Sequence, residues 1–249
     1  MDRQDPARER AHFEQVAAAG EHVYWAERTP AGLRRRELRA ALVADTADAP
    51  RLGDGARVLD IGCGTGDYTK PFASHTRATV VAIDVTPVLL TIARPNVPPN
   101  VRLVAADVER LPFATGAFDA VIGNAVLHHL RLDRALPELR RVLRPGGRLC
   151  FAEPNMLNPQ VFLERNVPFI GRWLENSPGE TAFTRWGLRR TLARLGLVDV
   201  AVRPFDFLYP ATPKRLVPMV ERLSRVLERT PLVSEIAGSL LISARRPID

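Results

Sequence analysis

Short apolar segments alternate with amphipathic segments along most of this 249-residue chain. Runs rich in β-branched and other apolar residues predict strands at residues 57–61, 78–83, 101–104, 117–122, 148–152, 197–203 and 239–245. Segments with helical spacing lie between them, at residues 68–73, 87–93, 133–143 and 184–195. Strands that alternate with helices at this period are typical of an α/β fold, so we predict a doubly wound, mostly parallel sheet.

The chain also holds segments that a minimal α/β core does not need. Two helices are predicted before the first strand, over residues 7–28 and from Pro30 to the loop at 45–55. Two further insertions follow the fifth and sixth predicted strands. Long insertions inside a compact domain are usually lids or binding loops, so we interpret these segments as caps.

The second insertion contains a predicted amphipathic helix. Its apolar stripe is formed by five residues, with arginines opposite: Leu216, Val220, Leu223, Val226 and Leu227. A basic helix of this kind packs on the protein's own core or lies on a membrane surface. Core packing is the commoner arrangement, so membrane contact is the minor alternative.

A glycine-rich stretch follows the first predicted strand. Gly62, Gly64 and Gly66 stand at alternate positions, and helical spacing restarts at Tyr68. A strand, a glycine turn and a helix in this order form a cradle for a nucleotide, because a ligand can approach the glycine backbone closely. The dinucleotide-binding pattern G-x-G-x-x-G needs its third glycine at the position of Asp67. The G-K-[ST] ending of a phosphate-binding loop is also missing. The spacing therefore favours a nucleoside-like ligand without phosphates.

An acidic residue ends the second predicted strand. Asp84 lies 22 residues beyond Gly62, close to the interval at which a carboxylate reaches a ribose. A carboxylate can accept hydrogen bonds from both ribose hydroxyls. The alternative is that Asp84 caps the helix that begins at Thr86 and Pro87. The preceding glycine motif favours ribose binding.

These features together resemble the class I S-adenosylmethionine-dependent methyltransferases, whose first motif is an acidic strand end running into G-x-G-x-G. The resemblance implies a seven-stranded sheet with an antiparallel last strand, which enters as a hairpin with the sixth. It also implies that N-terminal helices close over cofactor and substrate. We predict four parts: an N-terminal helical cap at residues 1–55, a cofactor-binding core at 56–153, a cap insertion at 154–183, and the C-terminal part of the sheet at 184–249. The last part includes a helical insertion at 206–235.

The resemblance also assigns residues to the cofactor S-adenosylmethionine. Asp107 would accept from the adenine amino group, and Val108 would supply a backbone N–H and an apolar wall. Asn124 would face the methionine end, with Asp60 near the sulfonium. Tyr24 would cover the cofactor, as a cation–aromatic contact or as a donor to its carboxylate. The implied cofactor-binding set is Asp60, Gly62, Cys63, Gly64, Gly66, Asp84, Val85, Asp107, Val108, Asn124 and Tyr24.

Candidates for acid–base chemistry lie after the fourth and fifth predicted strands. His128 and His129 are adjacent, and imidazole titrates nearest to neutral pH. Glu153 leaves the fifth strand at the edge where ligands bind, where it would pair with a histidine or hold a substrate amine or hydroxyl. The alternative is that the histidine pair is structural. Of the two, we favour His129 as the catalytic base.

Composition and charge limit the other classes of function. The net charge of +7 is carried by arginines dispersed among acids, and only Arg34 to Arg36 form a run, which we interpret as a solvated helix face. This distribution does not favour nucleic acid. The polar N-terminus is no signal peptide and no segment is long enough to span a membrane, so we expect a cytoplasmic protein. Two cysteines are too few for a disulfide framework, and no histidine spacing indicates a metal site.

The sequence therefore predicts a methyltransferase that acts on a small-molecule acceptor, at an oxygen, nitrogen or carbon atom. A natural product, a sugar or a lipid-linked molecule would suit an enclosed pocket under three caps. The missing third glycine and Asp67 argue against a nicotinamide oxidoreductase. A nucleic-acid methyltransferase and a non-catalytic partner protein that binds the cofactor remain as alternatives. The oligomeric state is left open.

Overall fold

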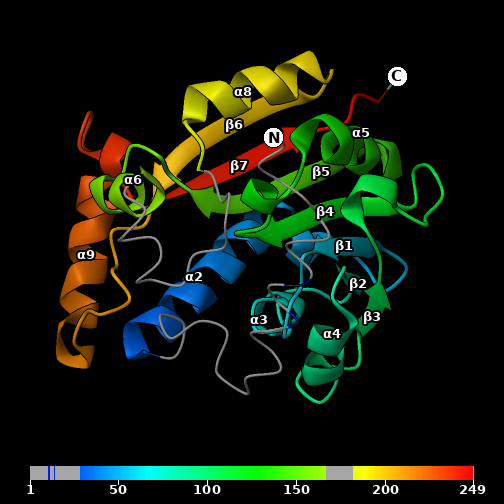
Figure 1. Cartoon of the computed structure of the whole chain (residues 1–249), viewed down its shortest axis with the longest axis horizontal. Coiled ribbons are helices and arrows are strands. Elements are labelled where there is room, and N and C mark those ends of the chain that lie inside the picture. The colour runs from blue at the N-terminus through cyan, green and yellow to red at the C-terminus, as the bar shows by residue number, and fades with distance from the viewer. Residues whose placement is uncertain (1–10, 12–13, 15–28, 167–181, 249) are drawn as a thin grey trace.

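The computed structural model describes residues 11, 14, 29–166 and 182–248. Its centre is a seven-stranded sheet with the order β3-β2-β1-β4-β5-β7-β6 (Figure 1). All neighbouring strands are parallel except β7, which is antiparallel to both β5 and β6. The predicted fold class is confirmed. The strands are β1 Arg57–Ile61, β2 Thr79–Asp84, β3 Val101–Ala105, β4 Phe118–Asn124, β5 Leu143–Pro154, β6 Val198–Phe205 and β7 Ser239–Arg245.

Helices cover both faces of this sheet. In Figure 1, α2, α3 and α4 lie on one side of the strands, and α5 and α8 lie on the other. The described α-helices are α2 Pro30–Thr46, α3 Thr69–Ala73, α4 Pro87–Ala93, α5 Leu132–Val142, α6 Pro159–Asn166, α8 Arg185–Arg194 and α9 Val217–Leu227. The 3-10 helices are η2 Ala49–Arg51, η3 Val108–Arg110, η4 Leu127–His129, η5 Lys214–Leu216 and η6 Ser234–Ile236.

Two apolar layers hold the helices on the sheet. Side chains alternate along a strand, so Leu59 and Ile61 of β1 face one layer while Val58 faces the other. The first layer buries the apolar sides of α5 and α8 against the sheet. The second buries α2 and α3, with Phe72 of α3 fully enclosed. Both faces of the parallel strands are therefore buried, as a doubly wound sheet requires.

Helix α2 starts where the sequence predicts. Thr29 is its N-cap, and the Thr29 hydroxyl accepts a hydrogen bond from Gly32 N at 2.9 Å. Pro30 occupies the first helical position, where its missing N–H costs nothing. The helix predicted over 7–28 lies outside the described residues, apart from the helical positions Ala11 and Glu14.

Strand β5 is longer than the sequence predicts. We expected a turn at 144–147 followed by a strand, whereas β5 begins at Leu143 and includes those residues. A register shift between Phe118 and Ala120 of β4 accommodates the extra residues. Gly146 N donates to Arg246 O at 3.0 Å, and Arg246 N donates to Gly147 O at 2.9 Å. Pairing with the residues after β7 therefore turns the predicted loop into a bulged part of the strand.

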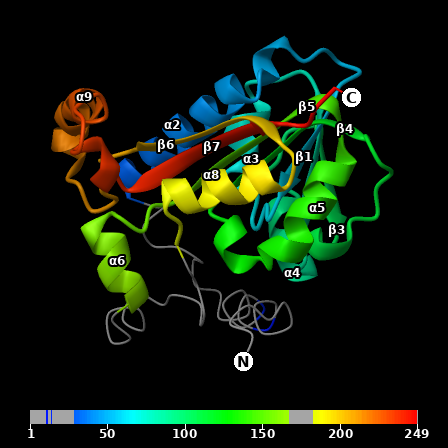
Figure 2. The same cartoon turned by 90° about the horizontal axis from the view of Figure 1, so that it is seen from above.

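The topology brings both insertions to one edge of the sheet. Strands β5 and β6 are both antiparallel to β7, so β6 runs in the same direction as β5 and as its parallel neighbour β4. Hence the segment between β6 and β7, with α9, leaves the same carboxyl edge as the glycine turn. The segment after β5, with α6, starts there too. Figure 2 shows α6 and α9 at the same end of the molecule. Among the described residues, no helix is long and apolar enough to cross a membrane.

Candidate functional site

The three glycines of the turn after β1 differ in their surroundings. All have positive φ: 65° at Gly62, 51° at Gly64 and 79° at Gly66. A Cβ added at Gly62 would clash with Val126, and one at Gly66 would lie 2.9 Å from Val97 Cγ1. At Gly64, nothing lies within 4 Å of that position. The outer two glycines therefore serve packing, while Gly64 leaves open space that a ligand can enter.

Asp84 joins the end of β2 to this turn. Gly64 N donates to its Oδ2 and Thr86 N donates to its Oδ1, both at 2.9 Å. Burial raises the pKa of Asp84 above its usual value. The N-cap of α4 is Thr86 rather than Asp84. Each carboxylate oxygen keeps a second lone pair, so Asp84 could still accept from ribose hydroxyls while it shapes the turn.

Asp60 lies beneath the turn at the end of β1. Its side chain accepts a hydrogen bond from the Thr69 hydroxyl at 2.6 Å, and only 1% of the residue is exposed. Burial raises the pKa of Asp60 to about 7, against the hydrogen bond from Thr69, which lowers it, and with a smaller contribution from the Asp84 carboxylate. Burial likewise raises the pKa of the Cys63 thiol, which makes Cys63 a packing residue rather than a nucleophile.

Tyr68 is a site residue that the sequence analysis missed. It is buried, and its hydroxyl has no hydrogen-bond partner. The charges that act on this hydroxyl are those of Asp60 and Arg39. A buried hydroxyl without a partner is costly unless a ligand supplies one. Its position two residues after the last glycine of the motif was the available signal. The predicted Tyr24 lies outside the described residues.

The segment after β3 carries the predicted adenine contacts. Asp107 is the N-cap of η3 and accepts from Glu109 N at 2.8 Å. Val108 is buried, and Val85, after β2, is half-buried. Because β1, β2 and β3 are adjacent parallel strands, these residues follow the same sheet edge as the glycine turn. The predicted adenine contacts and the glycine turn therefore lie along one edge of the sheet.

His128 is buried and held by Glu153. The two side chains meet at 2.8 Å, from His128 Nδ1 to Glu153 Oε2. The other carboxylate oxygen, Oε1, accepts from Val126 N and Leu127 N, both at 2.8 Å. Burial, followed by the neighbouring His129, lowers the pKa of His128 to about 4. His128 is therefore neutral at physiological pH, and Glu153 positions the turn after β4 instead of facing a substrate.

His129 occupies a different environment from its neighbour. It is half-buried, and its ring centroid lies 4.1 Å from that of His128. It follows β4, which pairs with β1, so it lies at the same edge of the sheet as the glycine turn. Of the two imidazoles, His129 is the one with partial exposure next to the cradle. The expected pairing of Glu153 with a histidine is present, and it involves His128.

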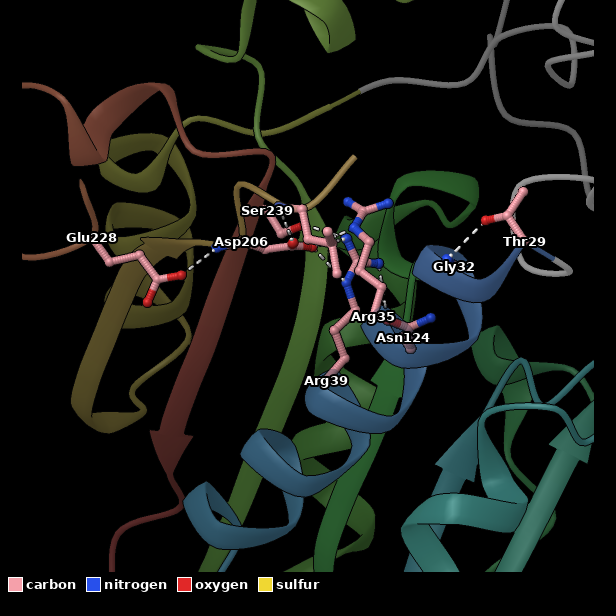
Figure 3. A network of polar contacts seen from close by, with 9 residues as sticks. Thr29, Gly32, Arg35, Arg39, Asn124, Asp206, Glu228 and Ser239 are labelled. Atoms are coloured by element: carbon pink, nitrogen blue, oxygen red, sulfur yellow. Dashed lines mark hydrogen bonds and ion pairs between the residues drawn. The ribbon is translucent and has the colours of Figure 1, made fainter. Parts of the chain in front are cut away.

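Arginines of α2 form a polar network beside the carboxyl end of β4 (Figure 3). Asp206 Oδ2 accepts from Arg35 Nε at 2.6 Å and from Arg39 Nη2 at 3.0 Å. Arg39 also donates to Ser239 Oγ, and its Nη1 reaches Asn124 Oδ1 at 3.5 Å. Asp206 therefore joins two arginines of α2, and Arg39 extends the network to Asn124, the last residue of β4.

The interpretation of residues 34–36 as a solvated helix face is wrong. Each arginine of this run has an acidic partner on another element. Arg34 Nε pairs with Glu221 of α9 at 2.6 Å, and Arg36 Nη1 pairs with Asp67 of the glycine turn at 3.1 Å. With the pair between Arg35 and Asp206, these contacts tie α2 to the insertion between β6 and β7 and to the cradle. Sequence spacing alone could not reveal the partners, because they lie far along the chain.

In the part of the chain that the structure describes, no three His, Cys, Asp or Glu side chains gather closely enough to bind a metal ion. The arrangement described above is instead that of a buried, polar cradle for an organic ligand. It offers an open glycine backbone, a carboxylate beside it and an unpartnered hydroxyl.

Comparisons with known sequences agree with this geometry. The family model "Methyltransferase domain" matches residues 59–151. The demethylmenaquinone methyltransferase of Renibacterium salmoninarum is 37% identical over 189 residues, which are 69% of this chain and 77% of that protein. The demethylmenaquinone methyltransferase of Thermus thermophilus is 38% identical over 158 residues, 59% of this chain and 68% of that protein. In other curated relatives the matched part spans as little as 25% of their length, and in several about half.

A solved structure has the same fold. It is the geranyl diphosphate C-methyltransferase of Streptomyces coelicolor A3(2), in complex with Mg2+, geranyl diphosphate and S-adenosyl-L-homocysteine. The TM-score is 0.66, and the match covers 97% of this chain and 98% of that one. The sequence identity is 18%, so this likeness concerns the fold.

Proposed function

This chain belongs to the class I S-adenosylmethionine-dependent methyltransferases, and we propose that it transfers a methyl group from that cofactor to a small-molecule acceptor. The observation that carries the proposal is the open space at Gly64 beside the Asp84 carboxylate. A backbone without a Cβ and an acceptor for ribose hydroxyls together suit a nucleoside.

The residues present fit this cofactor. Because Gly64 has no Cβ, the cofactor could come close to the backbone of this residue, and the Asp84 carboxylate would accept hydrogen bonds from the ribose hydroxyls. Val85, Asp107 and Val108 would hold the adenine. The orphaned Tyr68 hydroxyl would gain a partner at the methionine end, where it could donate to the cofactor carboxylate.

Asn124 and Arg39 would also act at the methionine end. Asn124 ends β4 there, and Arg39 brings its guanidinium to the Asn124 amide. A guanidinium beside the Asn124 amide suits a carboxylate, so this pair supports binding of the cofactor carboxylate at the same edge.

When bound, S-adenosylmethionine supplies an activated methyl group on a sulfonium centre. The chain would then contribute position and, for oxygen or nitrogen acceptors, a proton acceptor. His129 is our candidate for that base, because it is partly exposed beside the cradle while His128 is buried and neutral. Glu153 would act as a positioning residue, since it holds the backbone of Val126 and Leu127 and the ring of His128.

Charge placement supports a small-molecule acceptor over nucleic acid. The basic run of α2 is engaged by Glu221, Asp206 and Asp67, so it offers no free row of cations for phosphates. The names of the two demethylmenaquinone methyltransferases agree with a small acceptor for this chain as well. Turnover with any acceptor would exclude the non-catalytic alternative.

Calorimetry with pure protein tests the proposal. S-adenosylmethionine and its demethylated product should bind, and NADH should not. Gly64→Val should abolish binding, because its side chain fills the open space, whereas Gly53→Val is a matched control in a loop that also has free space. Asp84→Asn should weaken binding by about 2–3 kcal/mol, the scale of charge-assisted hydrogen bonds.

Two outcomes would contradict the proposal. Tight binding of NADH, with no binding of S-adenosylmethionine, would show that the glycine turn is not a site for this cofactor. Normal binding by a folded Gly64→Val variant would show that the ligand approaches elsewhere. Far-ultraviolet circular dichroism of each variant separates these results from misfolding.

A further inference from the structure

Helix α9 turns its acidic residues toward the protein. Glu221 accepts from Arg34 of α2 at 2.6 Å, and Glu228, just after the helix, accepts from Asp206 N at 2.9 Å. Val217 and Ser224 are buried on the same side. These contacts fix the orientation of α9, so its opposite side is exposed to solvent.

The outward side of α9 carries an exposed apolar stripe. Met219, Leu223 and Val226 follow helical spacing and are 58%, 51% and 61% exposed. Leu216, at the end of η5, continues the stripe. Single exposed apolar residues are ordinary, but a stripe along one helix indicates an interaction surface. The sequence analysis placed Val220 and Leu227 in this stripe, and the structure leaves both of them half-buried.

Basic residues flank this stripe without acidic partners. All five are exposed: Lys214, Arg215, Arg222, Arg225 and Arg229. Throughout the described ranges, no ion pair involves any of them, whereas Arg34 is the residue that engages Glu221. We call the apolar stripe and these cations together the α9 face. It is apolar along its centre line and positive along its border.

Neighbouring elements extend the apolar part of this face. Leu232 and Ile236 follow α9 in the chain and are exposed, as are Phe162 and Leu163 of α6. Asn158, just before α6, donates to Ile236 O at 2.8 Å, so α6 and η6 are held together. Both views place α6 and α9 at the same end of the molecule (Figures 1 and 2).

The composition of the α9 face discriminates between occupants. A second copy of the chain, related by a twofold axis, would bring two sets of unpaired cations together. Nucleic acid would be attracted by the cations and would gain nothing from Met219, Leu223 and Val226. An anionic lipid surface satisfies both parts, because its headgroups attract the cations and its acyl boundary accepts the apolar stripe.

We propose that the α9 face docks this protein peripherally on membranes that contain anionic lipid. The helix would lie in the plane of the interface, with Met219, Leu223 and Val226 buried among the acyl chains. The flanking arginines would reach the headgroups with their guanidinium groups, as long basic side chains do. Docking is independent of the proposed methyl transfer, so either can fail without the other.

Sedimentation with lipid vesicles tests this proposal on the full chain. The protein should bind vesicles of phosphatidylcholine with phosphatidylglycerol, and much less vesicles of phosphatidylcholine alone. Met219→Asp with Val226→Asp should weaken binding at least about tenfold, since a charge replaces each buried apolar side chain. Arg222→Gln with Arg225→Gln should weaken it by about 10- to 30-fold at low salt and by less at high salt.

Matched controls come from helices elsewhere on the surface. Ile92→Asp on α4 also replaces an exposed apolar residue, and Arg189→Gln with Arg190→Gln on α8 also removes two exposed charges. These variants should bind like the unchanged protein. The proposal is overturned if the protein ignores anionic vesicles, or if the α9 variants and the controls bind equally. Binding that depends on Arg222 and Arg225 but not on Met219 and Val226 would also overturn it, because the stripe would then not insert.

Discussion

Replacement of Glu153 tests how the turn after β4 is held. Glu153 accepts three hydrogen bonds of 2.8 Å in a site where it is 1% exposed. Glu153→Ala would remove the acceptor of the backbone N–H groups of Val126 and Leu127 and the contact with the ring of His128. An unsatisfied buried donor costs about 1–3 kcal/mol, so the two backbone donors predict a loss of roughly 2–6 kcal/mol in the free energy of unfolding. That loss is a large part of the stability of an ordinary domain.

Urea denaturation followed by circular dichroism measures this loss. Glu153→Gln is the matched variant, because its carbonyl oxygen can still accept from Val126 N and Leu127 N. Its amide group can donate to His128 Nδ1 once the neutral imidazole carries its proton on Nε2. We expect the Gln variant to lose less than about 2 kcal/mol, since all three contacts are kept and only the charge of the acceptor is lost.

The same pair of variants has a catalytic consequence. In the Ala variant the turn that carries His129 would lose its anchor, so turnover should fall more than cofactor affinity. The Gln variant should recover most of the turnover. If Glu153→Ala costs less than about 1 kcal/mol, the turn is held by its packing and the three hydrogen bonds contribute little.

Other changes test the cradle, the candidate base and the buried acid. Gly62→Ala should lower the free energy of unfolding by about 2–4 kcal/mol in urea, because its Cβ meets Val126 at positive φ, while Gly64→Ala should cost only about 1 kcal/mol. His129→Ala should reduce kcat by about 10²–10³, with a cofactor Kd close to that of the unchanged protein. Burial raises the pKa of Asp60 to about 7 in the folded protein, whereas its ordinary value in the unfolded chain is 3.8. Between these two pH values the carboxyl group keeps its proton in the folded protein and loses it in the unfolded chain. Stability from this group is complete below the unfolded pKa and is lost as the pH rises to about 7, so Asp60→Asn should gain roughly 2–4 kcal/mol at high pH and little at low pH.

The sequence by itself determined the architecture and the location of the cradle. Strand and helix periods predicted the doubly wound sheet, because the spacing of apolar residues reflects which side of an element is buried. β1 and α4 have the predicted bounds, and β2 differs by a single residue at each end. The glycine spacing and the acid after β2 identified the turn and the class of ligand, since both depend on local backbone geometry.

Long-range contacts were beyond the reach of local patterns. The strand length of β5 depends on pairing with residues after β7, and the roles of the α2 arginines depend on Asp206, Glu221 and Asp67. Adjacent histidines look equivalent in the sequence. The tertiary structure separates them, because burial keeps His128 neutral at its contact with Glu153, while His129 stays partly exposed.

The three glycines show the same division within one motif. The sequence predicted a turn that needs glycine, which is a property of the local backbone. Only the packing of Val126 and Val97 shows that Gly62 and Gly66 are required by the protein's own side chains. Only the open space around Gly64 marks the position left for a ligand. Local conformation depends on nearby residues and can be predicted from the sequence, whereas the spatial neighbours of a residue depend on how distant segments pack together.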